Sequence, residues 1–337
     1  MTTTVNNELN PGKLLQLSGS YWNTCTLHAG VKLDVFTVIG EKKLSAHDVA
    51  AQMKAPERSL AMLLDALCAM ELLEKTGDLY SNSIVSSTFL SKSSPKYIGF
   101  MIMHHHHLVE SWSRLDESVM SGKPVRSRAT FSDDAKRESF LMGMFNIAMA
   151  TAPGLVPTID ISGRKTLLDL GGGPGTYAIQ FCLHNKDIKA TVFDLPTTRP
   201  FAEKTIARFN QQDRITFQGG NFLVDEIKAS FDVVWISHIL HAETPEDCHK
   251  LIKKAASVLN PGGMIIIHDF ILNNSRSAPL FPALFSLNML VGTDGGQSYS
   301  EVEIMDMLDD AGFVNMERTP YKGPMESGII TALMPDI

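Results

Sequence analysis

The sequence predicts an α/β protein in which a mainly helical module precedes a Rossmann-like domain. The chain has 337 residues, more than a single domain usually holds, so we expect two domains. Residues 14–100 repeat apolar side chains at the spacing of helices. From residue 164 onward, short apolar runs alternate with helical patterns, which is typical of a parallel sheet covered by helices on both faces.

Composition narrows the class of protein. The chain is 44% hydrophobic and 20% charged, as ordinary globular proteins are. A net charge of -7 argues against nucleic acid as a partner, because phosphate contacts need clustered Lys and Arg. We find no apolar run of about 18 residues that would span a membrane, and no apolar signal core in the first residues. The sequence therefore favours a cytoplasmic protein with reduced thiols at four scattered cysteines, Cys25, Cys68, Cys182 and Cys248.

The pattern of residues 1–98 predicts a winged-helix module. Ser45 begins the helix LSAHDVAAQM with Asp48 three residues later, close to a capping box. A second helix follows in PERSLAMLLDALCAMELLEK, and TGDLYSNS predicts a hairpin wing. DNA binding is one function of such modules, but this second helix is basic only at its ends, at Arg58 and Lys75. Its broad apolar face favours packing against another protein chain instead.

Residues 99–150 predict linking helices that contribute to a substrate pocket. Within them, the run MIMHHHHLVESW raises the alternative of a metal site. Only His104 and His107 share a helix face, and two ligands alone make a poor site. We therefore expect no metal there, but a pocket wall or a packed or solvated helix surface.

Residues 151–337 predict the Rossmann-like domain, with strands that are all parallel. Helical patterns, among them TYAIQFCLHN, TPEDCHKLIKKAASVLN and YSEVEIMDMLDDAGF, separate most of the apolar runs. In chain order, the predicted strands are KTLLDL, IKATVFDL, RITFQGG, FDVVWIS, MIIIHDF and GIITALM.

The segment DLGGGPG, Asp169 to Gly175, follows the first of these strands and opens a helix, the context of a nucleotide-binding turn. Thr176 stands where GxGxxG would have its last glycine, so the spacing is DxGxGxG instead. The extra carboxylate suits a ligand with a cationic amino-acid end, and Asp194 at the end of the next strand suits a ribose hydroxyl. Together these features favour S-adenosylmethionine over NAD.

These motifs, in this order, resemble the plant-type (caffeic acid and acetylserotonin-like) two-domain small-molecule O-methyltransferases, especially their bacterial natural-product members. The resemblance covers nearly the whole chain. It implies a class I methyltransferase fold, a winged-helix dimerisation domain, a homodimer, and methylation of a small, aromatic hydroxylated secondary metabolite. The motifs that carry it are LDVF, LLDLGGGPG, FDLP, GGNF, HILHAETPEDC, PGGMIIIHD and GTDGG.

The resemblance also implies roles for individual residues. Asn221 stands where the family has an aspartate beside the adenine, and its amide oxygen can still accept a hydrogen bond, without charge. Plain core packing is the alternative for the apolar residues implied for the substrate. The implied cofactor residues are Asp169, Gly171, Gly173, Gly175, Asp194, Leu195, Gly220, Asn221 and Phe222, and the implied substrate residues are Trp112, Phe140, Met144 and Met289.

The segment HILHAETPEDC contains two histidines, of which His241 matches the catalytic base of the family. Thr244 predicts a helix N-cap with Pro245 at the first helical position, which places His241 in a loop at the carboxyl edge of the sheet. A neutral imidazole can take the proton of a hydroxyl acceptor near pH 7. His238 lies nearer the strand, and we expect it to be a packed or hydrogen-bonded core histidine.

The neighbours of the candidate base differ from the family pattern. The usual His-Asp-Trp is His-Ala-Glu here, and the resemblance implies that Asp269 orients His241. A second carboxylate of the family aligns with Ser298, and its loss would weaken stabilisation of the imidazolium ion. Glu243 and Glu301 are the candidates to replace it.

Three alternatives stay open beside O-methylation. The acceptor atom can be nitrogen or carbon. The fold can also serve a non-methylating reaction such as cyclisation, decarboxylation or hydroxylation, which the missing second carboxylate favours. The third alternative is a DNA-binding regulator that senses the cofactor, and only the winged helix supports it.

Overall fold

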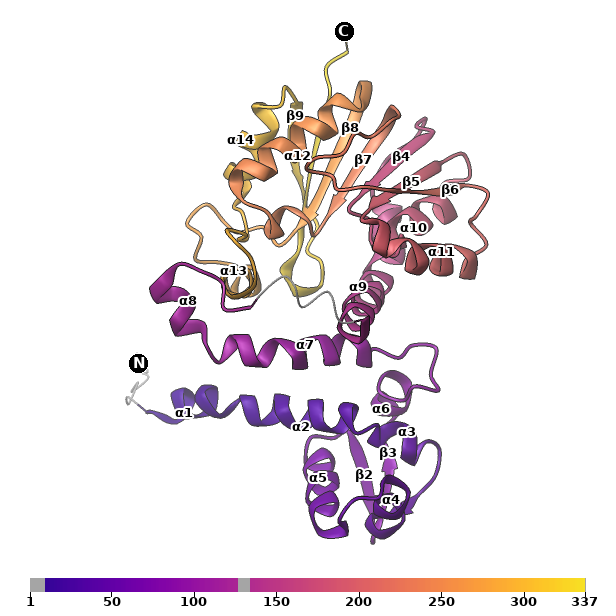
Figure 1. The fold of residues 1–337 in the computed structure, drawn as a ribbon, viewed down its shortest axis with the longest axis vertical. Helices are drawn as coiled ribbons and strands as arrows, with labels where there is room; N and C mark the ends of the chain where they lie inside the picture. The colour runs from indigo at the N-terminus through magenta and orange to yellow at the C-terminus, as the bar shows by residue number, and fades with distance from the viewer. Residues whose placement is uncertain (1–9, 127–133, 337) are drawn as a thin grey trace, which may run out of the picture. The chain divides into compact units, whose positions relative to one another are not determined.

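The structure, a computed structural model, describes residues 10–126 and 134–336, with residues 134–136 described by their backbone only. The chain forms two compact units, residues 1–106 and 107–337. Their boundary falls inside the predicted linking segment, 99–150, and the predicted limits at residues 98 and 150 stay predictions. Figure 1 shows the helices and strands of both units.

The N-terminal unit is helical with a small sheet, as predicted. Its three strands form an antiparallel sheet in the order β1-β3-β2, and the predicted wing is the β2–β3 hairpin. The capping box is present, because the Ser45 side chain accepts from the Asp48 backbone N–H while the Asp48 carboxylate accepts from Ser45. In chain order the elements are α1 (Gly12–Gly19), α2 (Tyr21–Lys32), α3 (Val35–Ile39), β1 (Leu44–Ser45), α4 (Ala46–Met53), α5 (Glu57–Ala69), β2 (Leu73–Thr76), β3 (Leu79–Asn82), α6 (Ile84–Phe89) and α7 (Gly99–Trp112), which crosses the boundary between the units.

The core of the N-terminal unit explains the helical spacing of its sequence. Residues three and four apart on α5, Leu60, Leu64 and Leu67, are buried together. They pack with Phe36 and Ile39 of α3 in one hydrophobic cluster. Most of the apolar face of α5 is therefore buried inside the unit.

The second unit is built on a seven-stranded sheet in the order β6-β5-β4-β7-β8-β10-β9. The first five strands of this order are parallel, while β10 runs antiparallel to both β8 and β9. The strands are β4 (Thr166–Leu170), β5 (Lys189–Asp194), β6 (Ile215–Gly219), β7 (Phe231–Ser237), β8 (Leu259–Asp269), β9 (Val314–Thr319) and β10 (Gly328–Leu333).

The prediction of an all-parallel sheet is wrong at this edge. Strand β9 was not predicted, because as an edge strand its residues are exposed or half-buried and lack the apolar run of a central strand. Eight residues, 320–327, connect β9 to β10. Such a connection is too short for a parallel crossover, which takes a dozen or more residues, so the two strands pair antiparallel.

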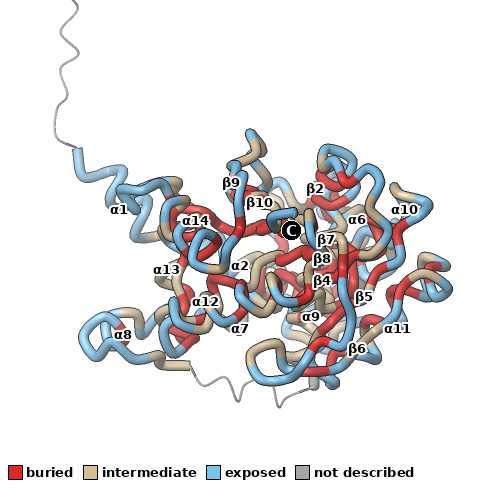
Figure 2. Tube along the Cα trace, turned by 90° about the horizontal axis from the view of Figure 1, so that it is seen from above, coloured by how far each residue is buried: buried red, intermediate tan, exposed pale blue. Residues whose placement is uncertain are grey.

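Helices cover both faces of this sheet, as the sequence predicts. One hydrophobic cluster joins α12 and α14 to the face that presents Leu168 and Val234, and a second joins α9, α10 and α11 to the face that presents Leu167 and Trp235. Figure 2 shows buried residues along the central strands β4, β7 and β8. The helices are α8 (Leu115–Ser121), α9 (Asp134–Leu155), α10 (Thr176–His184), α11 (Arg199–Arg208), α12 (Pro245–Ser257), α13 (Leu280–Gly292) and α14 (Glu301–Asp309).

One helix in the described part of the chain has the length and apolar composition of a membrane span, contrary to the sequence-based expectation. The segment is Arg137–Thr158, most of which is α9. Polar residues such as Asn146 and Thr151 interrupt it, so no uninterrupted apolar run marks it in the sequence. Ala152 and Leu155 of this helix are buried in the hydrophobic core of the unit, which accounts for part of its apolar surface.

Candidate active site

The glycine turn between β4 and α10 forms the floor of the candidate site. Gly171, Gly173 and Gly175 have positive φ values of 72°, 54° and 79°, a conformation that L side chains rarely adopt. A fourth glycine, Gly172, was not singled out from the sequence, yet a Cβ there would lie 2.6 Å from Cγ of Asp169. The turn therefore wraps closely around the Asp169 carboxyl group.

Asp169 and Asp194 lie at the ends of two neighbouring parallel strands, as predicted. Asp169 is buried, and its Oδ2 accepts from the Ala178 backbone N–H at 3.1 Å. Burial, with the nearby charge of Asp194, raises the pKa of Asp169 to about 7. Burial also raises the pKa of Asp194. Two carboxyl groups with raised pKa values, close to one cavity, favour a ligand that carries positive charge.

Asp194 also ties two loops together. Its Oδ2 accepts from the Gly173 backbone N–H at 2.8 Å, while Oδ1 accepts from Leu195 N–H at 2.7 Å and from the Thr198 hydroxyl at 3.0 Å. A carboxylate has about four lone-pair positions, so capacity remains for a ligand hydroxyl. The prediction that Asp194 binds a ribose is compatible with these contacts.

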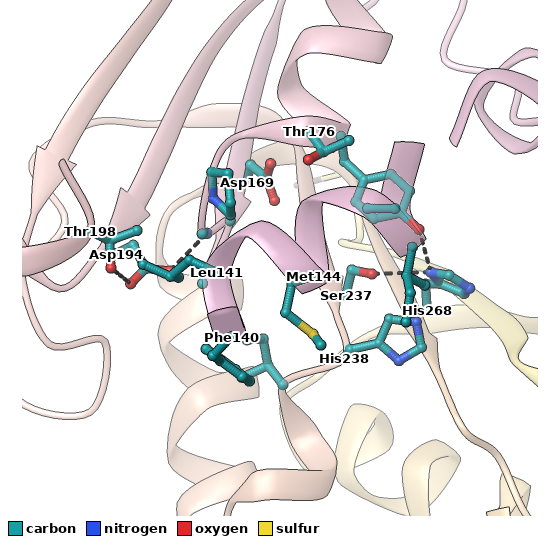
Figure 3. Close-up of a pocket in the computed structure, with 18 of the residues that line it drawn as sticks. Phe140, Leu141, Met144, Asp169, Thr176, Asp194, Thr198, Ser237, His238 and His268 are labelled. Atoms are coloured by element: carbon teal, nitrogen blue, oxygen red, sulfur yellow. Dashed lines mark hydrogen bonds between the residues drawn. The ribbon is translucent and has the colours of Figure 1, made fainter. Parts of the chain in front are cut away.

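A cavity of about 300 Å³ opens above the glycine turn. Figure 3 shows Asp169 and Asp194 toward one side, His238 and His268 toward the other, and Met144 of α9 between them. The predicted residues Phe140, Met144 and Leu195 line this cavity. Its apolar walls are completed by Leu141, Ile147, Ala148, Ile239, Pro324 and Met325.

The polar end of the cavity centres on His268, which the sequence analysis missed. Its Nδ1 lies 3.0 Å from the Ser237 hydroxyl and 3.3 Å from the Tyr177 hydroxyl, and its Nε2 lies 3.0 Å from the Ser327 hydroxyl. Burial, together with neighbouring His238, holds the pKa of His268 well below its usual range, so this ring is neutral. The feature of the sequence that could have identified His268 is its place inside the apolar run MIIIHDF, one residue before Asp269.

His241 and Asp269 are brought together as predicted. His241 Nδ1 lies 2.7 Å from Asp269 Oδ1, and the Phe270 backbone N–H donates to the same oxygen at 2.8 Å. Burial opposes ionisation of Asp269, but His241 and His238 beside it hold its pKa well below its ordinary value. Rings of Phe270 and Phe285 flank His241, with centroids at 5.8 and 4.8 Å.

His238 packs against Phe270 and His268, but it is not the core histidine that we expected. Its side chain is 24% exposed and lines the cavity, and its Nδ1 lies 3.7 Å from Asp269 Oδ1. Strand β7 ends at Ser237, and His238 has a φ of 56°, so the chain leaves the regular path of the strand at this residue. Among the described residues, the cavity lining includes His238 and not His241.

The residues implied for the adenine lie on the loop after β6. A Cβ at Gly220 would lie 2.5 Å from the Phe193 ring, so the residue allows close packing there. The Asn221 side-chain oxygen accepts from the Leu223 backbone N–H at 2.9 Å, which is a structural use of the group predicted to meet the adenine. Gly220, Asn221 and Phe222 are absent from the described lining of the cavity, and their cofactor contacts stay predictions.

Two predicted substrate residues lie outside the described lining as well. Met289 is buried on α13, and the Trp112 indole N–H donates to the Asn288 side-chain oxygen at 3.0 Å. For both, packing accounts for what the structure shows, and their substrate contacts stay predictions.

Ser298, for which the resemblance implies the place of a second carboxylate, is fully buried. The Ser298 hydroxyl has no hydrogen-bond partner in the described part of the chain. The Glu301 carboxylate is paired with Arg318 at 2.9 Å. Tyr299 donates to the backbone oxygen of Glu243, not to its carboxylate.

One cluster has the composition of a metal site. His238, His241 and Asp269 each offer a ligand atom within 4.8 Å of the others, and no second group of three such residues is found in residues 10–126 and 134–336. Within the N-terminal unit, His106 Nε2 lies 3.1 Å from Lys32 Nζ, and its ring packs edge-on against His28.

A buried hydroxyl group without a hydrogen-bond partner shows whether the site fits the predicted cofactor. The hydroxyl of Thr176, the first residue of α10, is buried beside the cavity without a partner among the described residues. A helix N-terminus with a free hydroxyl suits a carboxylate, while Asp169 suits an ammonium and Asp194 a ribose. These residues fit S-adenosylmethionine.

Comparison with known proteins matches both parts of the chain. Residues 118–314 match the model of the O-methyltransferase domain, and residues 15–92 match the O-methyltransferase dimerisation domain. The tetracenomycin polyketide synthesis 8-O-methyltransferase of Streptomyces glaucescens is 31% identical over 321 residues, covering 93% of this chain and 94% of that protein. A 3-hydroxy-5-methyl-1-naphthoate 3-O-methyltransferase of Streptomyces sahachiroi is 29% identical, with 96% and 95% covered.

Other relatives and a solved structure extend this comparison. An N,N-dimethyltransferase of Streptomyces rimosus is 27% identical, covering 96% of both chains, and an L-tyrosine C(3)-methyltransferase of Streptomyces lavendulae is 27% identical, covering 91% of this chain and 88% of that one. Human N-acetylserotonin methyltransferase, solved in complex with S-adenosylmethionine, superposes with a TM-score of 0.87 at 25% identity, covering 98% of this chain and 100% of that one.

Proposed function

Because this chain belongs to the family of O-methyltransferases that carry a dimerisation domain, we propose that it methylates a hydroxyl group of a small aromatic metabolite. It is an S-adenosylmethionine-dependent methyltransferase of secondary metabolites, in the class EC 2.1.1. The observation that carries the choice of a hydroxyl is the buried His241–Asp269 pair at 2.7 Å, which can accept the proton that such an acceptor loses.

The glycine turn and its two carboxyl groups would hold the cofactor. The Thr176 hydroxyl and the start of α10 would meet its carboxylate, Asp169 its ammonium group and Asp194 its ribose. When bound, the cofactor supplies a methyl group already activated by a sulfonium centre. The protein therefore needs to align the acceptor and remove its proton.

The tautomer of His241 follows from its partner. Asp269 is ionised, because its pKa lies well below the ordinary value, and an ionised carboxylate only accepts hydrogen bonds. His241 Nδ1 therefore carries the hydrogen that it donates to Asp269 Oδ1, and Nε2 is left to accept a proton. The carboxylate then stabilises the imidazolium ion that forms.

The cavity supports an aromatic acceptor. Apolar side chains of α9 and of the loop before β10 form much of its walls, together with polar residues of the same segments such as Arg137, Thr151 and Ser327. Two relatives are named for O-methylation of a naphthoate and of a polyketide, whose hydroxylated rings would suit such walls.

N- and C-methylation are the competing reactions. Relatives are named for an N,N-dimethyltransferase and for a C-methyltransferase acting on tyrosine, so family membership alone does not fix the acceptor atom. The His241–Asp269 pair favours oxygen, because a neutral amine can attack before it loses its proton. A reaction without methyl transfer, such as cyclisation, decarboxylation or hydroxylation, is the remaining alternative.

The N-terminal unit supports a homodimer in place of DNA binding. It matches a dimerisation domain, and apolar side chains are exposed along α1 and the start of α2: Leu14, Leu15, Leu17, Tyr21 and Trp22. A second copy of the chain would cover such a face.

The proposal is tested by supplying phenolic and quinone-like acceptors with isotope-labelled methyl donor and locating the label in the product by mass spectrometry and NMR. We expect one methyl per product, bound to oxygen, with an equimolar amount of S-adenosylhomocysteine. Label on nitrogen or carbon, or a product without label, would contradict it.

A further inference from the structure

Two imidazole rings share one buried carboxylate in this site. His241 Nδ1 and His238 Nδ1 lie 2.7 and 3.7 Å from the same atom, Asp269 Oδ1, and the two ring centroids are 6.1 Å apart. No Lys or Arg forms an ion pair with Asp269 in the described part of the chain. In the described residues, this buried carboxylate therefore meets the two imidazoles and the backbone N–H groups of His241 and Phe270.

Of the two rings, His238 has the closer relation to the cavity. It lines the wall, whereas His241 is held between Phe270 and Phe285. The His238 ring is itself positioned by packing, with centroid distances of 4.4 Å to Phe270 and 4.5 Å to His268. The buried Nδ1 of His238 has no hydrogen-bond partner in the described part of the chain, and at 3.7 Å from Asp269 Oδ1 it lies within ion-pair but not hydrogen-bond distance of that carboxylate.

His268 does not compete for this role. Both of its nitrogens lie near hydroxyl groups, and burial keeps it neutral. Its contacts with Ser237 and Ser327 fix its ring, and that ring supports His238 from the side.

We propose that His238 is a second catalytic base of this enzyme, which takes the acceptor's proton while the charge of Asp269, 3.7 Å away, stabilises the imidazolium ion that forms. This inference rests on the proposed function. The acceptor O–H bond breaks and its proton passes to the imidazole. The oxygen forms a bond to the methyl carbon, and the electron pair of the broken carbon–sulfur bond stays on sulfur. The proton then leaves to water, and a single carboxylate serves whichever imidazole carries the charge.

The conformation of His238 dictates the variant that tests it. With a φ of 56°, position 238 tolerates Asn or Gly better than Ala, because these residues adopt the left-handed region most readily. H238N therefore removes the imidazole without imposing a new backbone strain. A matched control is H249N on α12, where the histidine is outside the cavity and pairs with Asp310.

The experiment compares kcat, KM and cofactor affinity for the wild type, H238N, H241N and the double variant. Because the two bases are alternative acceptors of one proton, the turnover left in H241N passes through His238, and we expect H238N to lower the kcat of H241N about 10-fold further. We expect free imidazole to restore part of the kcat that H238G removes from the H241N background, which a purely structural role of His238 would not allow. Cofactor affinity and the H249N control should stay within about twofold of the wild type.

Three outcomes would overturn the inference. They are an unchanged kcat on adding H238N to H241N, a rise in acceptor KM alone on that addition, and no rescue by imidazole of the H238G and H241N double variant. Each of these can occur while the wild type still methylates oxygen, so failure of the inference differs from failure of the proposed function, in which the wild type transfers no methyl to a hydroxyl.

Discussion

The carboxyl group of Asp169 lies buried beneath the glycine turn, and burial with the charge of Asp194 raises its pKa to about 7. The same group titrates near 3.8 in the unfolded chain. The folded state therefore binds the proton more tightly, and the stability that this gives is present at low pH and is lost as pH rises toward about 7. The full effect is at most about 4 kcal/mol, at about 1.4 kcal/mol per pKa unit.

We predict that D169N removes this dependence in the cofactor-free enzyme. The difference in melting temperature, variant minus wild type, should grow as pH is raised from 4 to 7 and then level off. Burial lowers the pKa values of His268 and His28, so these two residues make the folded state less stable as pH falls. Both are present in the wild type and in the variant, so their effect cancels in the difference. A difference that stays constant over this range would contradict the prediction.

Individual residues were predictable where a motif fixed their place at a strand end. Asp194 and Asp269 end their strands and Asp169 is the last residue but one of β4, while the pairing of Asp269 with His241 was implied by the family resemblance. His238 was predicted wrongly because a sequence pattern does not report a positive φ at the end of a strand. His268 was missed because it lies within an apolar run and has its partners on distant segments.

The turn between β4 and α10 is the element on which cofactor binding depends in this account. A Cβ at Gly172 would lie 2.6 Å from Cγ of Asp169, so a side chain there must displace the carboxyl group or the turn. We predict that G172A weakens S-adenosylmethionine binding about 10-fold or more, measured by titration calorimetry.

G154A is the matched control for this substitution. Gly154 lies in α9, and a Cβ there would meet no atom within 4 Å, so Ala should be accommodated and cofactor affinity should not change. Equal affinities of G172A and G154A for S-adenosylmethionine would contradict the prediction, because they would mean that the turn accommodates a side chain at residue 172.

At the scale of elements, helix caps could be predicted from the local sequence, but the strands at one edge of the sheet could not. The caps at Ser45 and Thr244 were predicted from hydrogen-bonding side chains and are present. The antiparallel pair β9–β10 was not predicted, because its direction depends on a short connection and its outer strand is polar. The length and apolar character of α9 were also missed, since polar residues interrupt its sequence.

For the whole molecule, the account expects two chains to associate through the exposed apolar face of α1 and α2. We predict that replacing Leu17 and Trp22 together by Ser converts a dimer into a monomer in light scattering coupled to size-exclusion chromatography. M62S, at an exposed residue of α5, should leave the dimer intact. A dimer that survives the double substitution would place the interface elsewhere.

The two-part organisation of the chain was predictable, because the change from helical spacing to alternating strands and helices spans many residues. The identity of the acceptor was not, because the cavity walls come from segments far apart in the sequence, such as Met144 of α9 and Met325 of the loop before β10. Only the folded chain brings these side chains together.

The central claim is that His241, supported by Asp269, removes the proton of a hydroxyl acceptor. The most direct test is the kcat of H241N, measured beside its affinity for S-adenosylmethionine. We predict a kcat lowered about 100-fold with cofactor affinity unchanged, since the ring contributes to proton transfer and lies apart from the glycine turn. A kcat within about twofold of the wild type, with product still methylated on oxygen, would contradict the claim.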